Sequence, residues 1–553
     1  MNHFITPRTG LMRLALAATV AAFGLTAAPA RGQSLPTGQT GTVQPASTQA
    51  NDAPVVLTLD EAIQIARVQN YALRNLKLDV ENAEAQVKQA WSSVYPQANL
   101  TTTFTRNLVS ANPFAGSSAG GLFQSLGYVD WLTYNEKARQ NNEQTLSFFD
   151  FQQKQAEGLA NAGVDLNSGG NPFGVANQFV NGVTVEQTLF NGTAFAAIRG
   201  AQALKDINAR AADRQEQLLV SQVKQAFFQA LLASSQADVA QQSVARTQQT
   251  VLEVSKQVAQ GVASKFQRLS EEVQLANLQT QLVQVQNQAS LSLDNLKMVL
   301  GIPIEQPILV EGDLKAANTN EFLTVSVDDA MAQAIESRPD LEQARLAIQL
   351  RKIDKDMTRA QYLPTVSAFL NMNYVGSVPS DRTSFFADSA NAFQYHTQSF
   401  SFFGDPYWNP SVSAGFRLSW NIFSGFNRSS QMQQKQIALT QAQNNAEQAL
   451  QTVKLDVERA LKNLQAARQR INSQEQNTAR AELNYQYAQA RLAEGVATQL
   501  EEREASEQLD QSRLNYLQAV YDYLVAKSAY DTAVGKPLPD VGSSSVRLTS
   551  NDL

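Results

Sequence analysis

The sequence predicts an α+β membrane protein, built as a tandem duplicated repeat in which long coiled-coil helices are joined to short transmembrane strands. One observation behind this prediction is a set of landmarks that recurs in the same order in both halves of the 553 residues. The other is local, because in each half stretches of alternating apolar and polar residues precede a long run without proline. Alternation with a period of two indicates strands, whereas a long run with a single glycine indicates helix.

The clearest repeated landmark is a hexapeptide, AQGVAS at 259–264 and AEGVAT at 493–498, which places Gly261 and Gly495 234 positions apart. Other pairs follow in the same order: segments 57–62 and 325–330, prolines 96 and 364, segments 188–192 and 421–425, and segments 301–303 and 535–537. The offset falls from 268 to 233 after the prolines, so the first half carries 35 additional residues there. A fixed order of landmarks indicates a tandem duplication.

The composition narrows the class of protein. A net charge of −6 disfavours a nucleic-acid partner. The absence of cysteine excludes disulfides and thiolate metal sites. Of the two histidines, His3 is expected to leave with a signal peptide, so His396 alone would remain for acid–base catalysis or metal binding. We therefore expect no enzyme activity, no cofactor and no metal site.

The N-terminal residues 1–30 are predicted to be a secretory signal peptide. Arg8 and Arg13 precede an apolar stretch at 14–25, and Ala-Pro-Ala at 28–30 forms a cleavage site with small residues. The apolar stretch is too short for a membrane-spanning helix, which needs about 20 apolar residues. Small polar residues then predict a flexible linker at 31–56, and a similar composition predicts a loose tail at 536–553.

Each half is expected to follow one plan. An amphipathic helix opens it, with Thr58 or Ser326 as the N-cap, and Pro96 or Pro364 ends that helix. The first repeat, 57–300, then has a β-hairpin at 97–190 with a long loop, a long helix at 192–258, a turn at Gly261 and a helix at 264–300. After a connector at 301–324, the second repeat, 325–535, has a β-hairpin at 365–423, a long helix at 427–492, a turn at Gly495 and a helix at 498–534.

The predicted strands have one apolar and one polar face. The alternation covers 98–104 and 183–189 in the first half, and 365–374 and 411–422 in the second. By itself this pattern slightly favours a soluble sheet with one buried face, but the signal peptide and the lack of cysteine favour a transmembrane β-barrel. Open sheet edges are unstable in lipid, and the smallest bacterial barrels have about eight strands. Four strands per chain therefore require several chains, and three chains would supply 12.

The long helices carry coiled-coil seams. Positions 453, 457, 460, 464, 467 and 471 alternate spacings of four and three, and positions 269, 273, 276, 280 and 283 repeat the spacing in the first half. The segments before the glycines would extend for about 100 Å at about 1.5 Å per residue. A lone glycine between two seams predicts a helix–turn–helix. The alternative is a mild kink in one continuous helix.

The loops inside the two hairpins, at roughly 107–181 and 375–410, are rich in glycine, asparagine, serine and aromatic residues. Outer-membrane barrels place their long loops outside the cell. The pattern leaves three roles open for the aromatic residues: the lipid interface, packing of the loop, or ligand binding. These residues are Trp131, Phe148, Phe149, Phe402, Phe403, Tyr407 and Trp408.

Taken in order, these features resemble the TolC-like outer-membrane efflux proteins, the outer-membrane factor family. The resemblance covers about 57–537 and rests on the order of elements twice over, including Phe-x-Gly after the second strand and Gly-x-Pro at the end of each half. It implies a homotrimer with a 12-stranded barrel in the outer-membrane lipid and a long α-helical barrel in the periplasm. It also implies that the helical tips dock a periplasmic adaptor protein, which joins the duct to an inner-membrane transporter.

The resemblance also assigns residues to the docking tips. These are Gly261, Val262, Ala263, Gly495, Val496 and Ala497. Well-known members carry valine before the glycine, whereas Gln260 and Glu494 stand there in this chain. The polar network that closes the entrance in some members has no charged equivalent here, because the matching positions are Gln267, Leu492 and Ala497.

The channel constriction of the family matches Glu501 and Glu504, where glutamate replaces the usual aspartate. Residues three apart share one helix face, so three copies would place six carboxylates around one axis. Such a ring should bind cations and reject anions. From the pattern alone, both glutamates would be read as part of a solvated helix face.

Two functions remain in view. The first is a passive exit duct for efflux of small molecules or for type I secretion, which needs no catalytic group. The second is an outer-membrane-anchored scaffold or adhesin, motivated by the 35 additional residues in the first hairpin loop. A scaffold would not need a carboxylate ring that faces a lumen, so the constriction distinguishes the two.

Overall fold

The computed structural model describes residues 54–109, 120–163, 175–314, 326–380, 382–388 and 391–536, without the side chains of 120–126. The chain divides into Met1–Pro54 and Val55–Leu553, and every element below belongs to the second unit. The expected signal peptide, nearly all of the linker and the tail beyond Lys536 lie outside the described residues.

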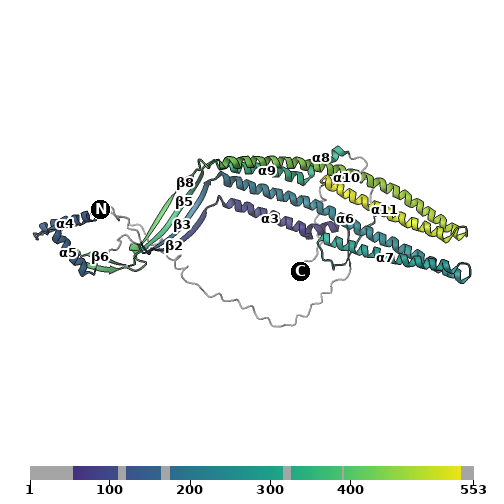
Figure 1. The fold of residues 1–553 in the computed structure, drawn as a ribbon, viewed down its shortest axis with the longest axis horizontal. Helices are drawn as coiled ribbons and strands as arrows, with labels where there is room; N and C mark the ends of the chain where they lie inside the picture. Colours follow the sequence, from purple (N-terminus) through teal and green to yellow (C-terminus); the bar gives the residue numbers. More distant parts are fainter. Residues whose placement is uncertain are drawn as a thin grey trace, which may run out of the picture. The chain divides into compact units, whose positions relative to one another are not determined.

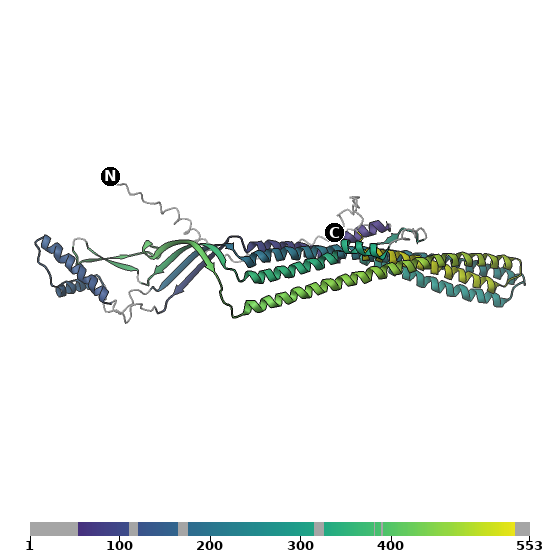
Figure 2. The same ribbon diagram turned by 90° about the horizontal axis from the view of Figure 1, so that it is seen from above.

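Two long helical hairpins dominate the described part of the chain. In the first, α6 (Gly192–Ala259) packs against α7 (Lys265–Leu300), and in the second α10 (Asn427–Ala493) packs against α11 (Gln499–Ala533). Figures 1 and 2 show the two hairpins side by side, with both turns at the same end. None of the helices in the described residues has the length and apolar character to cross a membrane.

Each half opens with two helices, whereas the sequence predicted one. The pairs are α2 (Leu59–Gln69) with α3 (Tyr71–Ser92), and α8 (Val327–Ser337) with α9 (Pro339–Ala360). Asn70 breaks the first pair because its side chain accepts a hydrogen bond from the N–H of Leu73 and so starts a new helix. Pro339 breaks the second pair, since it has no N–H to continue α8 and is well suited to a first helical turn.

The two breaks make matching contacts with the ends of the hairpins. Asn70 Nδ2 donates to the carbonyl oxygen of Val299 at 2.9 Å, and Arg338 Nη1 donates to that of Ala533 at 3.3 Å. Arg338 follows Asn70 by 268 positions, and Ala533 follows Val299 by 234, which are the two offsets of the sequence landmarks. The same joint therefore occurs twice in the described part of the chain.

A four-stranded antiparallel sheet continues the helices. Its order is β2 (Gln97–Arg106), β3 (Asn177–Phe190), β5 (Thr365–Val378) and β8 (Trp408–Ser419). The helices adjoining these strands in sequence, α3, α6, α9 and α10, pack in the same order. Figure 1 shows strands and helices as two successive tiers.

The register of the sheet gathers apolar side chains on one face. Side chains of residues directly opposite each other lie on the same face of a sheet. One row is Leu100, Val183, Met372 and Val412, and the next is Ala98, Val185, Leu370 and Ala414. A register shift between Thr188 and Phe190 places Phe190 opposite Val366, which is on the face of Leu370. The intervening rows are largely polar, as in Asn99, Thr184, Asn371 and Ser413.

The linker and the connector contain a small sheet that the sequence analysis missed. β1 (Val55–Leu57) pairs in parallel with β4 (Ile308–Val310). The prediction of a flexible linker as far as residue 56 is therefore wrong at its end. Val-Val-Leu and Ile-Leu-Val are short β-forming segments, and Leu57 and Ile308 are buried in the core beside α2.

The hairpin loops contain regular structure of their own. α4 (Gly120–Gln140) and α5 (Phe148–Asn161) lie in the first loop, and β6 (Thr383–Ala387), β7 (Tyr395–Ser399) and the short helix η2 (Asp405–Tyr407) lie in the second. Most of the aromatic residues in question pack within this region. Trp131 contacts Phe148, and Trp408, at the start of β8, stacks on Phe403. Phe149 is 74% exposed, and Phe403 remains 71% exposed despite its contact with Trp408.

The two predicted seams have different surroundings. The seam of α10 is buried against the rest of the chain, with Val457 0% and Leu464 3% exposed. The seam expected on α7 is exposed instead, with Leu269 at 54%, Val273 at 61% and Val283 at 57%. The spacing thus identified an apolar stripe on α7 correctly, but no described element of the same chain covers it.

Candidate functional site at the helical turns

The two predicted turns have the same backbone geometry. Gly261 and Gly495 have φ of 77° and 71°, values that glycine adopts without a steric cost. The N–H groups of the two residues after each glycine return to one carbonyl, that of Gln257 in the first turn and Arg491 in the second. These bonds reverse the chain in five residues, so the sequence folds here as a tight helix–turn–helix rather than a kinked helix.

A capping box starts the second helix of each hairpin. Ser264 and Gln267 form it in α7, and Thr498 and Glu501 form it in α11. The Glu501 carboxylate accepts from the Thr498 N–H at 3.5 Å and lies 3.4 Å from Arg491 Nη1. Glu501 therefore has a local structural role, which the sequence analysis did not assign to it.

Glu504 has different surroundings from Glu501. Its side chain is exposed, and it lines a groove of about 530 Å³ between the first turns of α7 and α11. The wall on the α7 side includes Phe266, which is 80% exposed, and Leu269. Leu500 contributes from α11. The structure thus places Glu504 beside an apolar strip, while the valines of the two turns, Val262 and Val496, are 77% and 62% exposed.

Two further glutamates near the turns were missed from the sequence. Glu271 on α7 is only 6% exposed and lies 3.6 Å from Arg503 Nη1 of α11. Burial raises the pKa of Glu271, against the charge of Arg503, and nearby Glu507 raises it further. Glu271 stands between two seam positions, so the pattern assigned it to solvent. Its equivalent in the second half, 234 positions later, is Ala505, which is buried. Comparing the two halves position by position would therefore have indicated that Glu271 is buried.

Glu502 is the second of these missed residues. Burial raises its pKa, a hydrogen bond with Tyr485 lowers it, and the charge of Glu271 raises it. Arg246 lies close by on α6 and forms an ion pair with Asp510 of α11. The four long helices thus meet near the turns in a partly buried polar cluster. Among the described residues, no group of acidic residues or histidines could hold a metal ion.

A family model described as outer membrane efflux protein matches residues 160–302 and 330–536, more than half of the chain. No curated protein sequence matches the chain significantly. Among solved structures, CusC superposes with a TM-score of 0.61 at 19% identity, over 86% of this chain and 92% of that one.

Two further solved structures are similar. The CmeC outer membrane channel of Campylobacter jejuni gives a TM-score of 0.63 at 13% identity, with 86% of this chain and 85% of that one covered. The MtrE outer membrane channel of Neisseria gonorrhoeae gives 0.60 at 14%, with 86% and 88% covered. At these identities the structural matches establish the fold.

Long helical hairpins that continue into a sheet with one apolar face define the class of outer-membrane channels. The chain belongs to the outer membrane efflux protein family. The resemblance inferred from the sequence is therefore confirmed. The protein is a transport channel component of the outer membrane, with its helical part in the periplasm, and its family is not one of enzymes.

Proposed function

We propose that the chain is one subunit of a homotrimeric exit duct, through which small molecules or a type I secretion substrate leave the cell. The observation that carries this proposal is the open sheet. β2 and β8 each pair on one side only in the described part of the chain, so their other edges present free N–H and C=O groups. Each unpaired backbone group costs several kcal/mol in lipid, and three copies of four strands would close a barrel of 12.

The repeated joints support a tandem duplication as the origin of the chain. The break at Asn70 and the break at Arg338 make equivalent contacts, and the turns at Gly261 and Gly495 have equivalent hydrogen bonds. Because each duplicated chain has two similar helical hairpins, a trimer has six of them around one axis. This arrangement suits a closed α-helical barrel in the periplasm.

The exposed apolar residues of the turns support a docking role. Val262 and Val496 lie at the two tips, and the groove containing Phe266 lies between them. Exposed apolar patches mark interaction surfaces, because water otherwise solvates them at a cost. We assign residues 261–263 and 495–497 to contact with a periplasmic adaptor protein, which would connect the duct to an inner-membrane pump.

Glu504 is the better supported of the two constriction residues. Its carboxylate is exposed and has no hydrogen bond or ion pair in the described part of the chain, whereas Glu501 caps α11. Three Glu504 carboxylates around one axis would attract cations and repel anions. Glu501 would add to the ring while it holds the start of the helix.

The test is the single-channel conductance of the purified protein in a planar bilayer. We expect Glu501→Gln with Glu504→Gln to lower the ratio of cation to anion permeability by roughly tenfold, about 1.4 kcal/mol. Glutamine is the appropriate replacement, because Gln267 forms the matching capping box in α7. Glu458→Gln, an exposed glutamate that pairs with Lys462 of the same helix, is the control.

The outcomes separate the two functions. Cation-selective current that the control variant retains and the double variant loses supports a duct with its constriction at these residues. A protein that inserts but passes no current, with or without the substitutions, contradicts the duct and favours the scaffold.

A further inference from the structure

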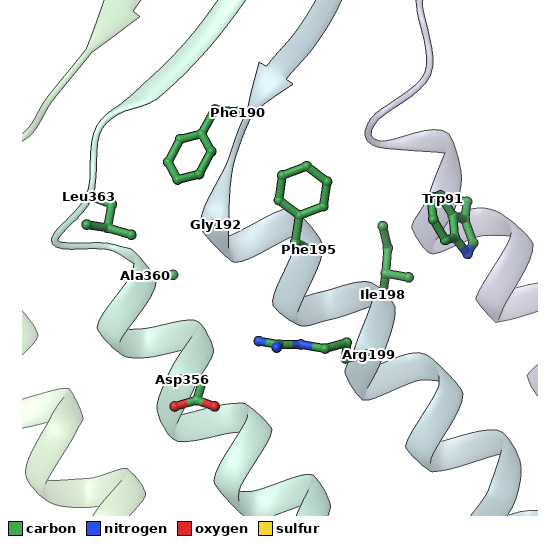
Figure 3. A pocket seen from close by; sticks show the side chains of 9 residues that line it. All are labelled: Trp91, Phe190, Gly192, Phe195, Ile198, Arg199, Asp356, Ala360 and Leu363. Atoms are coloured by element: carbon green, nitrogen blue, oxygen red, sulfur yellow. The ribbon is translucent and has the colours of Figure 1, made fainter.

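An apolar pocket lies where the sheet passes into the helices. It has a volume of about 490 Å³ and lies among α3, α6 and α9, at the end of β3 (Figure 3). Trp91, Phe190, Phe195 and Leu363 supply its apolar walls. Gly192 and Ala360 also line it, and a Cβ added at Gly192 would lie 3.0 Å from the Cβ of Ala360, so α6 and α9 approach closely there with almost no side-chain bulk between them.

The pocket opens on the apolar face of the sheet. The register shift in β3 puts Phe190 opposite Val366, in the same face as Leu370. Trp91 is 44% and Phe195 41% exposed, so these aromatic residues continue the apolar face beyond the ends of the strands. In an outer-membrane protein this face meets lipid, and aromatic residues mark the level of the headgroups.

The lining of the pocket becomes more polar from the strands toward the helices. Phe190 and Leu363 lie nearest the strands, Phe195 comes next, and the charged Arg199 and Asp356 lie farthest from them (Figure 3). The four residues from Ala360, at the end of α9, back to Asp356 correspond to about 6 Å along the helix. That distance is similar to the thickness of a headgroup layer. The order matches a phospholipid of the inner leaflet, whose chains enter the membrane and whose headgroup faces the periplasm.

The two charged residues come from different helices. Arg199 on α6 and Asp356 on α9 are both exposed, and the Arg199 side chain extends from α6 toward α9 (Figure 3). No hydrogen bond or ion pair within 4.0 Å joins them in the described part of the chain. A guanidinium binds a phosphate through paired hydrogen bonds, and a carboxylate binds an ammonium group.

We propose that this pocket is a binding site for one phospholipid with a phosphoethanolamine headgroup. Arg199 contacts the phosphate, Asp356 contacts the ammonium group, and an acyl chain lies against Phe195 and Trp91. The site rests on the outer-membrane location of the protein and does not depend on the duct. Because Arg199 and Asp356 lie at the same depth, the ligand needs one negative and one positive group at that depth. A lipid with a purely anionic headgroup lacks the positive group.

The experiment measures lipid retained by the full-length protein. The purified assembly is stripped of lipid in detergent, mixed with phosphatidylethanolamine or phosphatidylglycerol, and analysed by native mass spectrometry for bound lipid per chain. We expect Arg199→Gln to lower affinity for both lipids by about tenfold, since a charge-assisted contact is lost. Asp356→Asn should reduce the preference for phosphatidylethanolamine, and Ala360→Phe should fill the pocket and abolish retention.

The matched control is Arg359→Gln, which removes an exposed arginine of α9 close to Asp356 that does not line the pocket. It should retain lipid like the unchanged protein. Phosphatidylethanolamine with brominated acyl chains gives a second readout, because a bound chain should quench the fluorescence of Trp91. The contribution of Trp91 is the part of the quenching that is lost in Trp91→Phe. Unchanged retention in Ala360→Phe would place the lipid elsewhere on the apolar face and overturn the proposal. Equal loss in Arg199→Gln and Arg359→Gln would overturn it as well, because the effect would then be one of net charge.

Discussion

At the scale of single residues, Glu271 shows how burial can outweigh an ion pair. Arg503 lies 3.6 Å away and favours the charged form, yet burial is the larger effect and raises the pKa of Glu271. Glu507 and Glu502 add negative charge around it, and Arg246 lies close to Glu502. A carboxylate in this position weakens the packing of α7 on α11, because the charged form is poorly solvated.

The first prediction concerns pH. The folded state binds a proton at Glu271 more tightly than the unfolded state, since its pKa is raised on folding. The associated stability is fully present below the ordinary pKa of 4.5 and is lost as the pH rises through the raised value. Hydrogen exchange of α7 and α11 near the turns, corrected for its intrinsic pH dependence, should therefore speed up from acid toward neutral pH.

Glu271→Gln should remove this pH dependence and stabilise the helical ends by about 1 kcal/mol at neutral pH. The control is Glu272→Gln, which affects an exposed carboxylate paired with Arg268 on the same helix. That variant should keep the pH dependence. Faster exchange in Glu271→Gln at neutral pH would mean that the contact with Arg503 is worth more than the burial of the charge costs.

At the scale of elements, the spacing of apolar residues located the seams, but it did not identify their partners. Val457 and Val283 both fit the same alternation of four and three, yet the first is buried within the chain and the second is exposed. Glycine marked both turns, because only a φ near 75° closes them. The break at Asn70 was missed, since a capping asparagine inside an apolar pattern gives a weak signal. Helices α4 and α5 were missed as well, because glycine and asparagine around them indicated loops.

The second prediction tests the exposed stripe of α7. Leu464→Ala on α10 should cost about 2 to 5 kcal/mol of folding stability, because Leu464 is 3% exposed in the chain. Val283→Asp should leave the secondary structure intact but dissociate the assembly, since we expect another copy to cover Val283. Circular dichroism with thermal unfolding reports the first effect, and light scattering of the detergent-solubilised protein reports the second.

Leu455→Ala is the control for both variants, because Leu455 is an α10 leucine that is 43% exposed. It should change stability by less than about 0.5 kcal/mol and leave the mass of the assembly unchanged. If Val283→Asp assembled normally, the α7 stripe would face water or an adaptor rather than a neighbouring subunit.

At the scale of the whole molecule, the sheet is the part that a single chain cannot complete. The alternation in the sequence predicted which residues of each strand are apolar, whereas the order and the register of the strands are findings of the structure, in which the joints at Asn70 and Arg338 hold the helices that adjoin the strands. The number of chains does not follow in the same way. It depends on how many copies of β2 and β8 can pair before the sheet closes.

The last prediction counts these copies by cross-linking. The sequence has no cysteine, so introduced cysteines are the only reactive thiols. Thr101→Cys on β2 is combined with Ser411→Cys or Ser413→Cys on β8, positions on the polar rows of the sheet. Within one chain these edges are three strand spacings apart, about 14 Å. A bismaleimide reagent shorter than about 10 Å should therefore link only neighbouring chains, and it should yield dimers and trimers with no larger product.

The control is Thr184→Cys with Asn371→Cys, two positions that pair directly within one chain, and it should give monomers only. Products of more than three chains would contradict a closed trimer. A product that stays monomeric in the edge variants would mean that the chains do not share a sheet.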